Sequence, residues 1–153
     1  MKRFLTALLF LFSAASFGQT KKQIDSVTFC FHKYKVPAGC TALSEYQLKG
    51  DNYSIIWIYA SEDMLQDMTD QFLSQMDGNM KKFTKQPITC YLLNNEVKGY
   101  RISYEKGAGT GYQLVAYGVA NGQPVIVQLN LDKEPLTNED IPEFPRQIIQ
   151  LTK

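Results

Sequence analysis

A thiol and an imidazole near the start of the chain have a spacing suited to binding a metal ion. Cys30 and His32 lie two positions apart within Ile24 to Tyr34, which we predict to be one strand, so both side chains point to the same face of it. Cysteine and histidine are ligands of zinc and copper. A complete site needs a further ligand, such as Cys40 or Cys90. The alternative is that no metal binds, and that Cys30 is simply a buried cysteine and His32 a polar residue on the sheet surface.

The three cysteines, Cys30, Cys40 and Cys90, also raise the question of a disulfide. In an oxidising compartment two of them could pair, and the sequence leaves all three pairings open. Three cysteines are too few for a scaffold built on disulfides, so the hydrophobic core must stabilise the chain. We favour the alternative in which all three thiols are reduced and buried.

Groups for acid, base or nucleophilic catalysis are scarce. The chain has one histidine, His32. Two positions along a strand separate it from Cys30 by about 6–7 Å, which is too far for a hydrogen bond between a thiol nucleophile and an imidazole base. Four carboxylates gather near the C-terminus without the glycine-centred pattern of a calcium loop, and they suit helix capping instead: Asp132, Glu134, Glu139 and Asp140. We therefore predict no enzyme and no cofactor, with a small hydrolase as the least favoured alternative.

A glycine-rich stretch offers a candidate binding loop formed by Gly107, Gly109, Thr110 and Gly111. Such glycines are typical of phosphate-binding loops, but those loops lead into a helix and carry a Gly-Lys-Ser/Thr sequence, whereas a strand is expected here. We therefore predict a flexible hairpin loop. Loops of this kind on a rigid sheet often bind ligands.

Methionines and aromatic residues are the remaining candidates for a binding surface. Met64, Met68, Met76 and Met80 follow the apolar stripe of a predicted helix, which favours core filling over a copper-binding or adaptable surface. Strand propensity explains most of the aromatic residues, although some of them could form an exposed patch for a partner or a glycan; they are Trp57, Tyr59, Tyr91, Tyr100, Tyr104, Tyr112 and Tyr117.

The candidate residues lie on or between predicted strands, and the first three of these strands precede a long helix. After the first strand, Leu43 to Leu48 is a second candidate, and Gly50-Asp51-Asn52 predicts a hairpin turn into a third. The third strand, Tyr53 to Ala60, is continuously apolar, which favours a central position with both faces buried.

A long amphipathic helix follows over about 61–80. Its apolar residues recur every three or four positions, as at Leu65, Met68, Phe72 and Met76, and Ser61 is a candidate N-cap. Because Gly78 weakens the last turns, the helix could end near Asp77.

Four more strands and a final helix complete the chain. The strands are Ile88 to Leu93, Val97 to Glu105, Tyr112 to Ala120 and Gln123 to Leu131, and Asn121-Gly122 is a strong hairpin signal between the last two. A C-terminal helix is expected to begin at Thr137 or Asn138 and to run through Leu151, with a kink at Pro145.

Short turns between consecutive strands mean antiparallel pairing. The sequence therefore predicts one α+β domain over residues 19–153, a curved antiparallel sheet of about six to seven strands packed by the long helix and the C-terminal helix. This element order, with an early strand that ends in Val36-Pro37-Ala38-Gly39, resembles the PsbP-like fold family. The resemblance implies non-catalytic accessory and binding roles, and it transfers no catalytic residue to this chain.

Residues 1–18 have the pattern of a secretory signal peptide. Lys2 and Arg3 precede an apolar run from Phe4 to Phe12, and small residues follow that allow cleavage after Gly18 or after Ala15. The run is shorter than the roughly 20 residues of a membrane-spanning helix. We therefore expect a periplasmic or secreted protein that does not span the membrane after cleavage.

The charge balance argues against nucleic acid as a partner. The whole chain has a formal charge of +1, and without Lys2 and Arg3 it has 14 basic and 15 acidic residues. No basic stripe is available for a phosphate backbone.

The leading hypothesis is an exported non-catalytic module that binds a cell-envelope protein through one sheet face or through the glycine-rich loop. The alternative is a carrier of a metal or a small apolar ligand, with a pocket between the long helix and the sheet.

Overall fold

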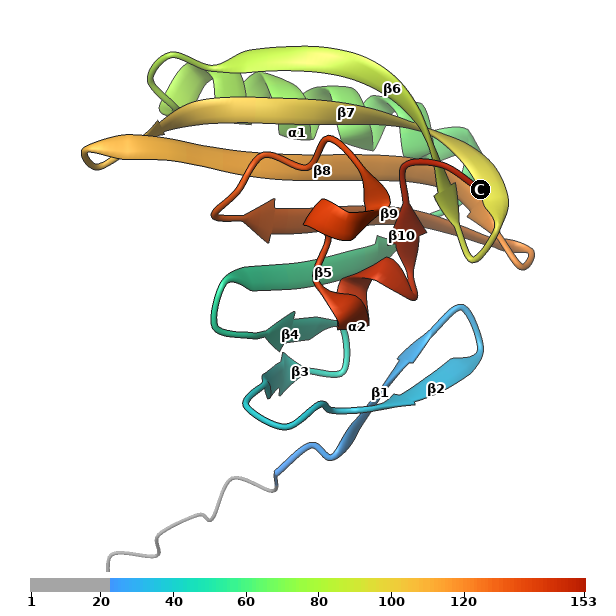
Figure 1. Cartoon of the computed structure of the whole chain (residues 1–153). Helices are drawn as coiled ribbons and strands as arrows, with labels where there is room; N and C mark the ends of the chain where they lie inside the picture. Colours follow the sequence, from blue (N-terminus) through green and yellow to red (C-terminus); the bar gives the residue numbers. More distant parts are fainter. Residues whose placement is uncertain (1–22) are drawn as a thin grey trace, which may run out of the picture.

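The computed structural model describes residues 23–153, and the predicted signal peptide lies outside them. The fold is α+β with entirely antiparallel pairing, as predicted, but it has more strands than the six to seven expected (Figure 1). Eight strands form one sheet in the order β10-β6-β7-β8-β9-β5-β4-β3, and β1 and β2 form a separate hairpin. Within these residues, no helix combines the length and the apolar character required to cross a bilayer.

The elements follow the chain in this order: β1 (Ser26–Phe29), β2 (His32–Lys35), β3 (Thr41–Ser44), β4 (Gln47–Lys49), β5 (Tyr53–Tyr59), η1 (Glu62–Met64), α1 (Leu65–Asn79), β6 (Thr84–Leu92), β7 (Asn95–Lys106), β8 (Gly109–Ala120), β9 (Gln123–Leu131), η2 (Asn138–Asp140), α2 (Glu143–Arg146) and β10 (Ile149–Gln150).

Two segments predicted as single strands are hairpins and account for two extra strands, and β10 is a third. The segment 24–34 folds back at Cys30 and Phe31 to pair β1 with β2. The segment 43–48 turns at Glu45 and Tyr46 to pair β3 with β4, with a register irregularity between Ala42 and Ser44. Neither turn contains glycine, proline or asparagine, the residues from which two-residue turns are usually predicted.

The long helix is confirmed in position, and Ser61 lies at the N-cap position as expected, but without the side-chain hydrogen bond of a cap. The helix begins as the 3₁₀ turn η1 and continues as α1 to Asn79. Leu65, Leu73 and Met76 are buried against the sheet. The methionine prediction holds only in part, because Met64 at the start of the helix is 52% exposed.

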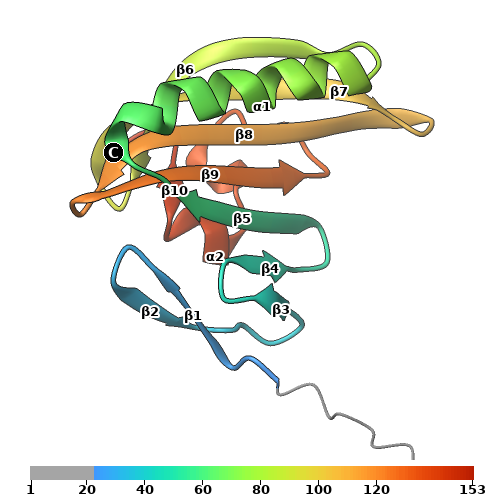
Figure 2. The same ribbon diagram turned by 180° about the vertical axis from the view of Figure 1, so that it is seen from behind.

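Strand β5 is interior to the sheet, but its two faces differ. Ile55 and Trp57 are buried in the core, whereas Ile58 on the opposite face is 49% exposed. Helix α1 contacts β8 and β9 and leaves the outer face of β5 largely uncovered, as Figure 2 shows. The expectation of burial on both faces is therefore wrong.

The four-strand meander agrees closely with prediction. Strands β6, β7, β8 and β9 pair in sequence, and β9 spans Gln123–Leu131 as expected. The turn between β8 and β9 consists of Asn121 and Gly122, both with positive φ. Alternation in β9 places Val125, Val127 and Leu129 in the core.

The predicted C-terminal helix is replaced by three short elements. Thr137 and Asp140 form a capping box around the single turn η2, and α2 has only four residues. A continuous helix is excluded because the Pro145 ring would clash with the backbone of Ile141 one turn earlier. The chain then continues into β10, which pairs with Tyr91 and Leu92 at the end of β6.

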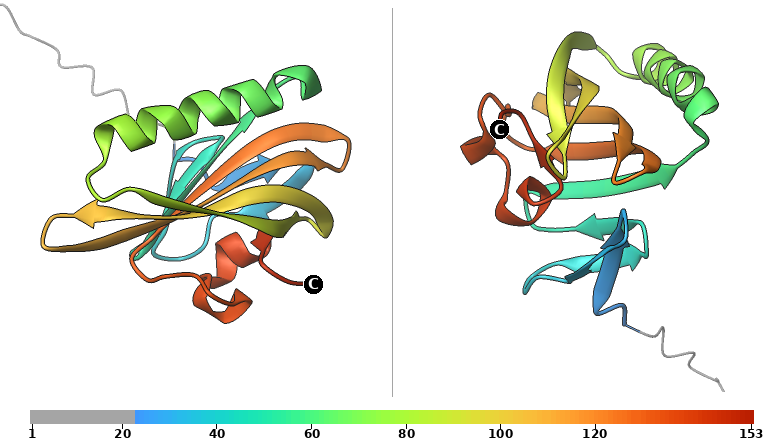
Figure 3. Two further views of the ribbon diagram at one scale, coloured as in Figure 1. Left: turned by 90° about the horizontal axis from the view of Figure 1, so that it is seen from above. Right: turned by 90° about the vertical axis from the view of Figure 1, so that its right-hand side faces the viewer.

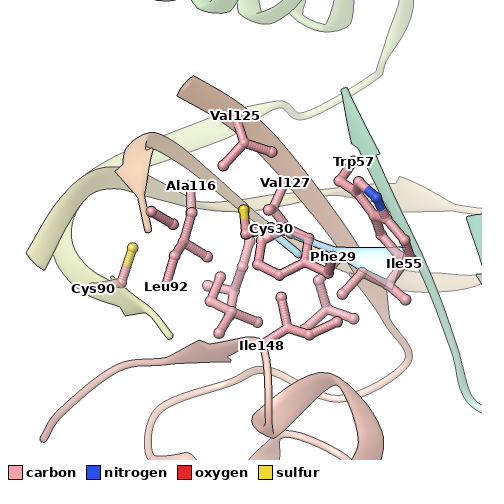
Figure 4. Packing of buried hydrophobic residues seen from close by; sticks show 14 of the residues in the cluster. Phe29, Cys30, Ile55, Trp57, Cys90, Leu92, Ala116, Val125, Val127 and Ile148 are labelled. Carbon is pink, nitrogen blue, oxygen red and sulfur yellow. The ribbon is translucent and has the colours of Figure 1, made fainter. Parts of the chain in front are cut away.

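The sheet carries one hydrophobic cluster on each face. One cluster lies between the sheet and α1, and the larger one lies between the sheet, the β1–β2 hairpin and the C-terminal segment. Figure 3 shows α1 and the C-terminal segment on opposite sides of the sheet. Figure 4 shows Phe29 and Cys30 of the hairpin among Ile55, Trp57 and Val127. The hairpin is therefore docked on the core by buried side chains.

Candidate functional site

An open cleft with aromatic walls lies where the β1–β2 hairpin meets the β3–β4 turn and the end of β5. Its volume is about 450 Å³, within the range of small-molecule sites. We name it the aromatic cleft and define it by its eight lining residues: Ser26, Thr28, Phe31, Lys33, Glu45, Tyr46, Tyr59 and Gln123. Two other hollows, of about 550 and 540 Å³, contain no aromatic side chain of comparable exposure.

Phe31 is the most unusual residue of the cleft. It is 74% exposed at the tip of the hairpin and adopts a φ of 70°, in the left-handed region. That region costs a residue other than glycine about 1–2 kcal/mol. Exposing a large apolar side chain in a strained conformation benefits neither folding nor solubility, and such strain concentrates at functional sites.

Two other hairpin turns of the same protein show what this position normally holds. The β6–β7 turn is Leu93-Asn94 and the β8–β9 turn is Asn121-Gly122, and all four residues have positive φ. The second residue of each is asparagine or glycine, which tolerate the left-handed conformation. Phe31 occupies the equivalent place in the first hairpin, so its phenyl ring is not explained by turn geometry.

The chain holds Phe31 in place through its neighbours. The Cys30 side chain is buried in the core at 1% exposure, and the Cys30 backbone N–H donates a 2.7 Å hydrogen bond to the Tyr59 hydroxyl oxygen. The pKa of Tyr59 is raised, mainly by burial, so the phenol stays protonated and its O–H remains a donor. The turn is thus anchored through both its buried thiol and its backbone.

Tyr46 and Tyr59 form the opposite corner of the cleft. Their ring centroids are 6.2 Å apart and the ring planes are nearly perpendicular, at 86°. Tyr46 sits on the β3–β4 turn and is 48% exposed, whereas Tyr59 is partly buried. An edge-to-face pair of this kind presents two apolar surfaces at right angles.

Polar side chains complete the walls and are free to bind. They are Ser26, Thr28, Lys33, Glu45 and Gln123. The side-chain hydrogen bonds and ion pairs found in residues 23–153 involve none of these five. Their donors and acceptors therefore remain available to a ligand.

The structure separates the two residues of the predicted metal site. Cys30 is a turn residue with a buried side chain, whereas His32 is exposed in β2, so the expectation that both project from one face of a single strand is wrong. His32 Nε2 accepts a 2.7 Å hydrogen bond from Asn121 Nδ2, which ties the hairpin to the β8–β9 turn. Among residues 23–153, no three histidine, cysteine or acidic side chains are grouped to hold a metal ion.

All three cysteines are free thiols in the structure. Burial raises the pKa of Cys30 to about 11 and that of Cys90 to about 12. Cys40 is only partly buried, and its Sγ lies 3.2 Å from the Tyr53 hydroxyl. The two buried thiols are therefore poor nucleophiles at neutral pH.

A thiol-specific reagent such as Ellman's reagent is expected to distinguish these sites at pH 8. Cys40 reacts in the folded protein, whereas Cys30 and Cys90 react at a comparable rate only after unfolding in guanidinium chloride, because they are buried and protonated. Peptide mapping after brief labelling identifies the modified cysteine. Rapid labelling of Cys90 in the folded protein would contradict the described core.

The predicted glycine-rich binding loop is a tight turn followed by a regular strand. Only Gly107 and Ala108 connect β7 to β8, while Gly109, Thr110 and Gly111 belong to β8 and pair with β7. The Tyr104 ring covers Gly111, where an added Cβ would lie 2.6 Å from the ring. Packing therefore accounts for Gly111. The connection is shorter than expected, but Gly107, Gly109 and Thr110 line the hollow of about 540 Å³, and their binding role stays a prediction.

The predicted pocket between the long helix and the sheet is small. A cavity of about 100 Å³ is lined by Ile56, Ile58, Met68, Phe72, Ile126 and Gln128. Ligand sites of drug-sized molecules typically have about 300–1,000 Å³. This volume is too small for a drug-sized ligand, so the aromatic cleft is the better candidate site for one.

Sequence reasoning identifies only part of the cleft. Tyr59 is among the aromatic residues considered for an exposed patch, but Phe31 and Tyr46 fall inside segments predicted as single strands. Two consecutive residues between Ser26–Phe29 and His32–Lys35 form a turn without any turn signal.

Comparison with known proteins does not supply a function: no protein-family model and no curated protein matches the chain.

Proposed function

We propose that the protein is an exported, non-catalytic binding module of the cell envelope whose ligand site is the aromatic cleft. The observation that carries this proposal is Phe31, a 74% exposed aromatic residue held in the left-handed region at the second turn position, where the β6–β7 and β8–β9 turns have asparagine and glycine. A binding role explains why an apolar ring is retained there despite its cost to folding.

Export rests on the sequence pattern of residues 1–18, with its basic start, apolar run and small residues at the cleavage point. The relationship to the PsbP-like fold family is part of the proposal as well. It rests on the resemblance in the sequence, namely the predicted element order and the Val36-Pro37-Ala38-Gly39 turn. The binding roles of that family agree with a ligand cleft that lacks a reactive thiol, because Cys30 beside it is buried.

Fragment screening by NMR tests the proposed site and requires no assumption about the natural ligand. In ¹H–¹⁵N spectra of the purified protein, fragments are expected to shift the resonances around Phe31, Tyr46 and Tyr59 more than those around Ile58. The variant Phe31→Gly should lose these shifts. Because glycine suits a φ of 70°, the same variant should be about 0.5–1 kcal/mol more stable than the wild type.

Three outcomes would count against the proposal. Fragments that cluster around Ile58 and Met68 would favour the cavity beside α1. Unchanged binding by Phe31→Gly would remove the role of the phenyl ring. Chemical conversion of a bound compound, seen as new ligand signals over several hours, would favour the hydrolase alternative.

A further inference from the structure

We propose that the aromatic cleft binds an uncharged saccharide, an inference that rests on the proposed binding function and names its ligand class. Three properties of the cleft support it: its apolar surfaces, its free polar groups and its charge. The last two each exclude a class of ligand.

The aromatic rings offer flat apolar surfaces of the size of a sugar ring. Phe31 and Tyr46 are exposed on two different turns, and Tyr59 lies between them at the end of β5. The face of an aromatic ring is electron-rich and attracts the weakly positive C–H groups of a ligand. A pyranose ring presents several C–H groups on one face, so it can stack on one ring while its edge contacts the second.

The polar groups of the cleft match hydroxyl groups. Ser26 and Thr28 contribute hydroxyls that both donate and accept, the Gln123 amide does the same, and Lys33 donates while Glu45 accepts. A sugar hydroxyl is also both donor and acceptor, so it can bond any of them. A purely apolar ligand would leave all five groups without partners and desolvated, at an energetic cost.

The charges of the cleft cancel. Lys33 and Glu45 line it together, and they are not one of the ion pairs formed within residues 23–153. One positive and one negative group give no net attraction for a polyanion such as a nucleic acid or for a polycation. An uncharged ligand with many hydroxyl groups is therefore favoured.

A peptide is the competing ligand. Aromatic grooves bind proline-rich peptides, and free strand edges bind extended peptides through main-chain hydrogen bonds. The cleft is lined by side chains from several elements, and the Glu45 carboxylate needs a hydrogen-bond donor, which proline lacks in its backbone. The peptide is tested as the alternative outcome.

Isothermal titration of the purified protein with neutral hexasaccharides of glucose, mannose, xylose and N-acetylglucosamine tests the inference. At least one of them is expected to bind and to shift the NMR resonances of Phe31 and Tyr46. The variants Phe31→Ala and Tyr46→Ala should each weaken binding about tenfold. Leu136→Ala serves as the matched control, because Leu136 is 56% exposed and lies outside the cleft.

The outcomes separate the ligand class from the proposed function. If none of the four hexasaccharides binds while a library of proline-rich peptides does so through Phe31, the saccharide inference is wrong and the binding function stands. If neither saccharides nor peptides nor fragments perturb Phe31, both are wrong. Equal weakening by Leu136→Ala would also overturn the inference, since the effect would not be specific to the cleft.

Discussion

Replacing Phe29 by alanine is expected to lower the free energy of unfolding by about 3–5 kcal/mol. Phe29 has no exposed surface and packs edge-to-face on Trp57, with ring centroids 5.6 Å apart (Figure 4). The truncation leaves a cavity between the hairpin and the sheet that the rigid β5 cannot fill. A loss of this size is a large fraction of the roughly 5–15 kcal/mol that stabilises a typical domain.

Urea denaturation followed by tryptophan fluorescence measures this effect. Trp57 is the single tryptophan of the chain and is 1% exposed, so its emission reports directly on docking of the hairpin. Phe31→Ala is the matched control, because it removes a phenyl ring two residues further along the hairpin, at an exposed position. This variant should change the free energy of unfolding by less than about 0.5 kcal/mol. A Phe29→Ala loss below about 1 kcal/mol would show that the hairpin does not depend on this contact.

Replacing Gly99 by alanine is expected to destabilise the sheet by about 2–3 kcal/mol through overpacking. Gly99 lies in β7 between β6 and β8. A Cβ there would lie 2.7 Å from the Val115 carbonyl oxygen and 2.9 Å from Cys90 Sγ. The carbonyl belongs to the backbone of an interior strand, so it cannot move away without disturbing the hydrogen bonds of the sheet.

The same substitution at Gly78 has the opposite expected sign. Gly78 lies in α1, where a Cβ added to it would meet no neighbouring atom within 4 Å, and alanine is favoured over glycine in a helix by about 1 kcal/mol. Guanidinium denaturation of both variants compares them directly. If Gly99→Ala proved as stable as Gly78→Ala, the close packing of β6, β7 and β8 at this point would be refuted.

How much of the fold can be predicted from the sequence depends on whether local chemistry identifies the turns. Asn121-Gly122 has the residues that a two-residue turn requires, and both strands are predicted to end and begin at this turn as observed, although β8 begins three residues earlier than expected, at Gly109. The helix is predictable because its apolar period is long and regular. The Cys30-Phe31 turn is missed because its residues favour strands, and the buried Cys30 side chain stabilises it through contacts distant in sequence.

The candidate site is harder to predict than the fold because its members come from separate turns. Phe31, Tyr46 and Tyr59 meet only after two unexpected hairpins fold against the end of β5. No spacing rule connects positions 31, 46 and 59. The residues singled out by local pattern lie outside this cleft. Cys30 and His32 anchor the first hairpin, and Gly107, Gly109 and Thr110 line a separate hollow.

The order of strands in the sheet also bears on how the protein avoids aggregation. Both terminal strands of an open sheet can recruit a strand from another molecule, and each end here is protected differently. Strand β3 has only four residues and an irregular register. The part of β6 that β10 does not cover contains Lys85, which is charged, and Pro87, which has no backbone N–H donor. Fibril-like stacking through either edge is thereby disfavoured, even at the high local concentrations of a crowded compartment.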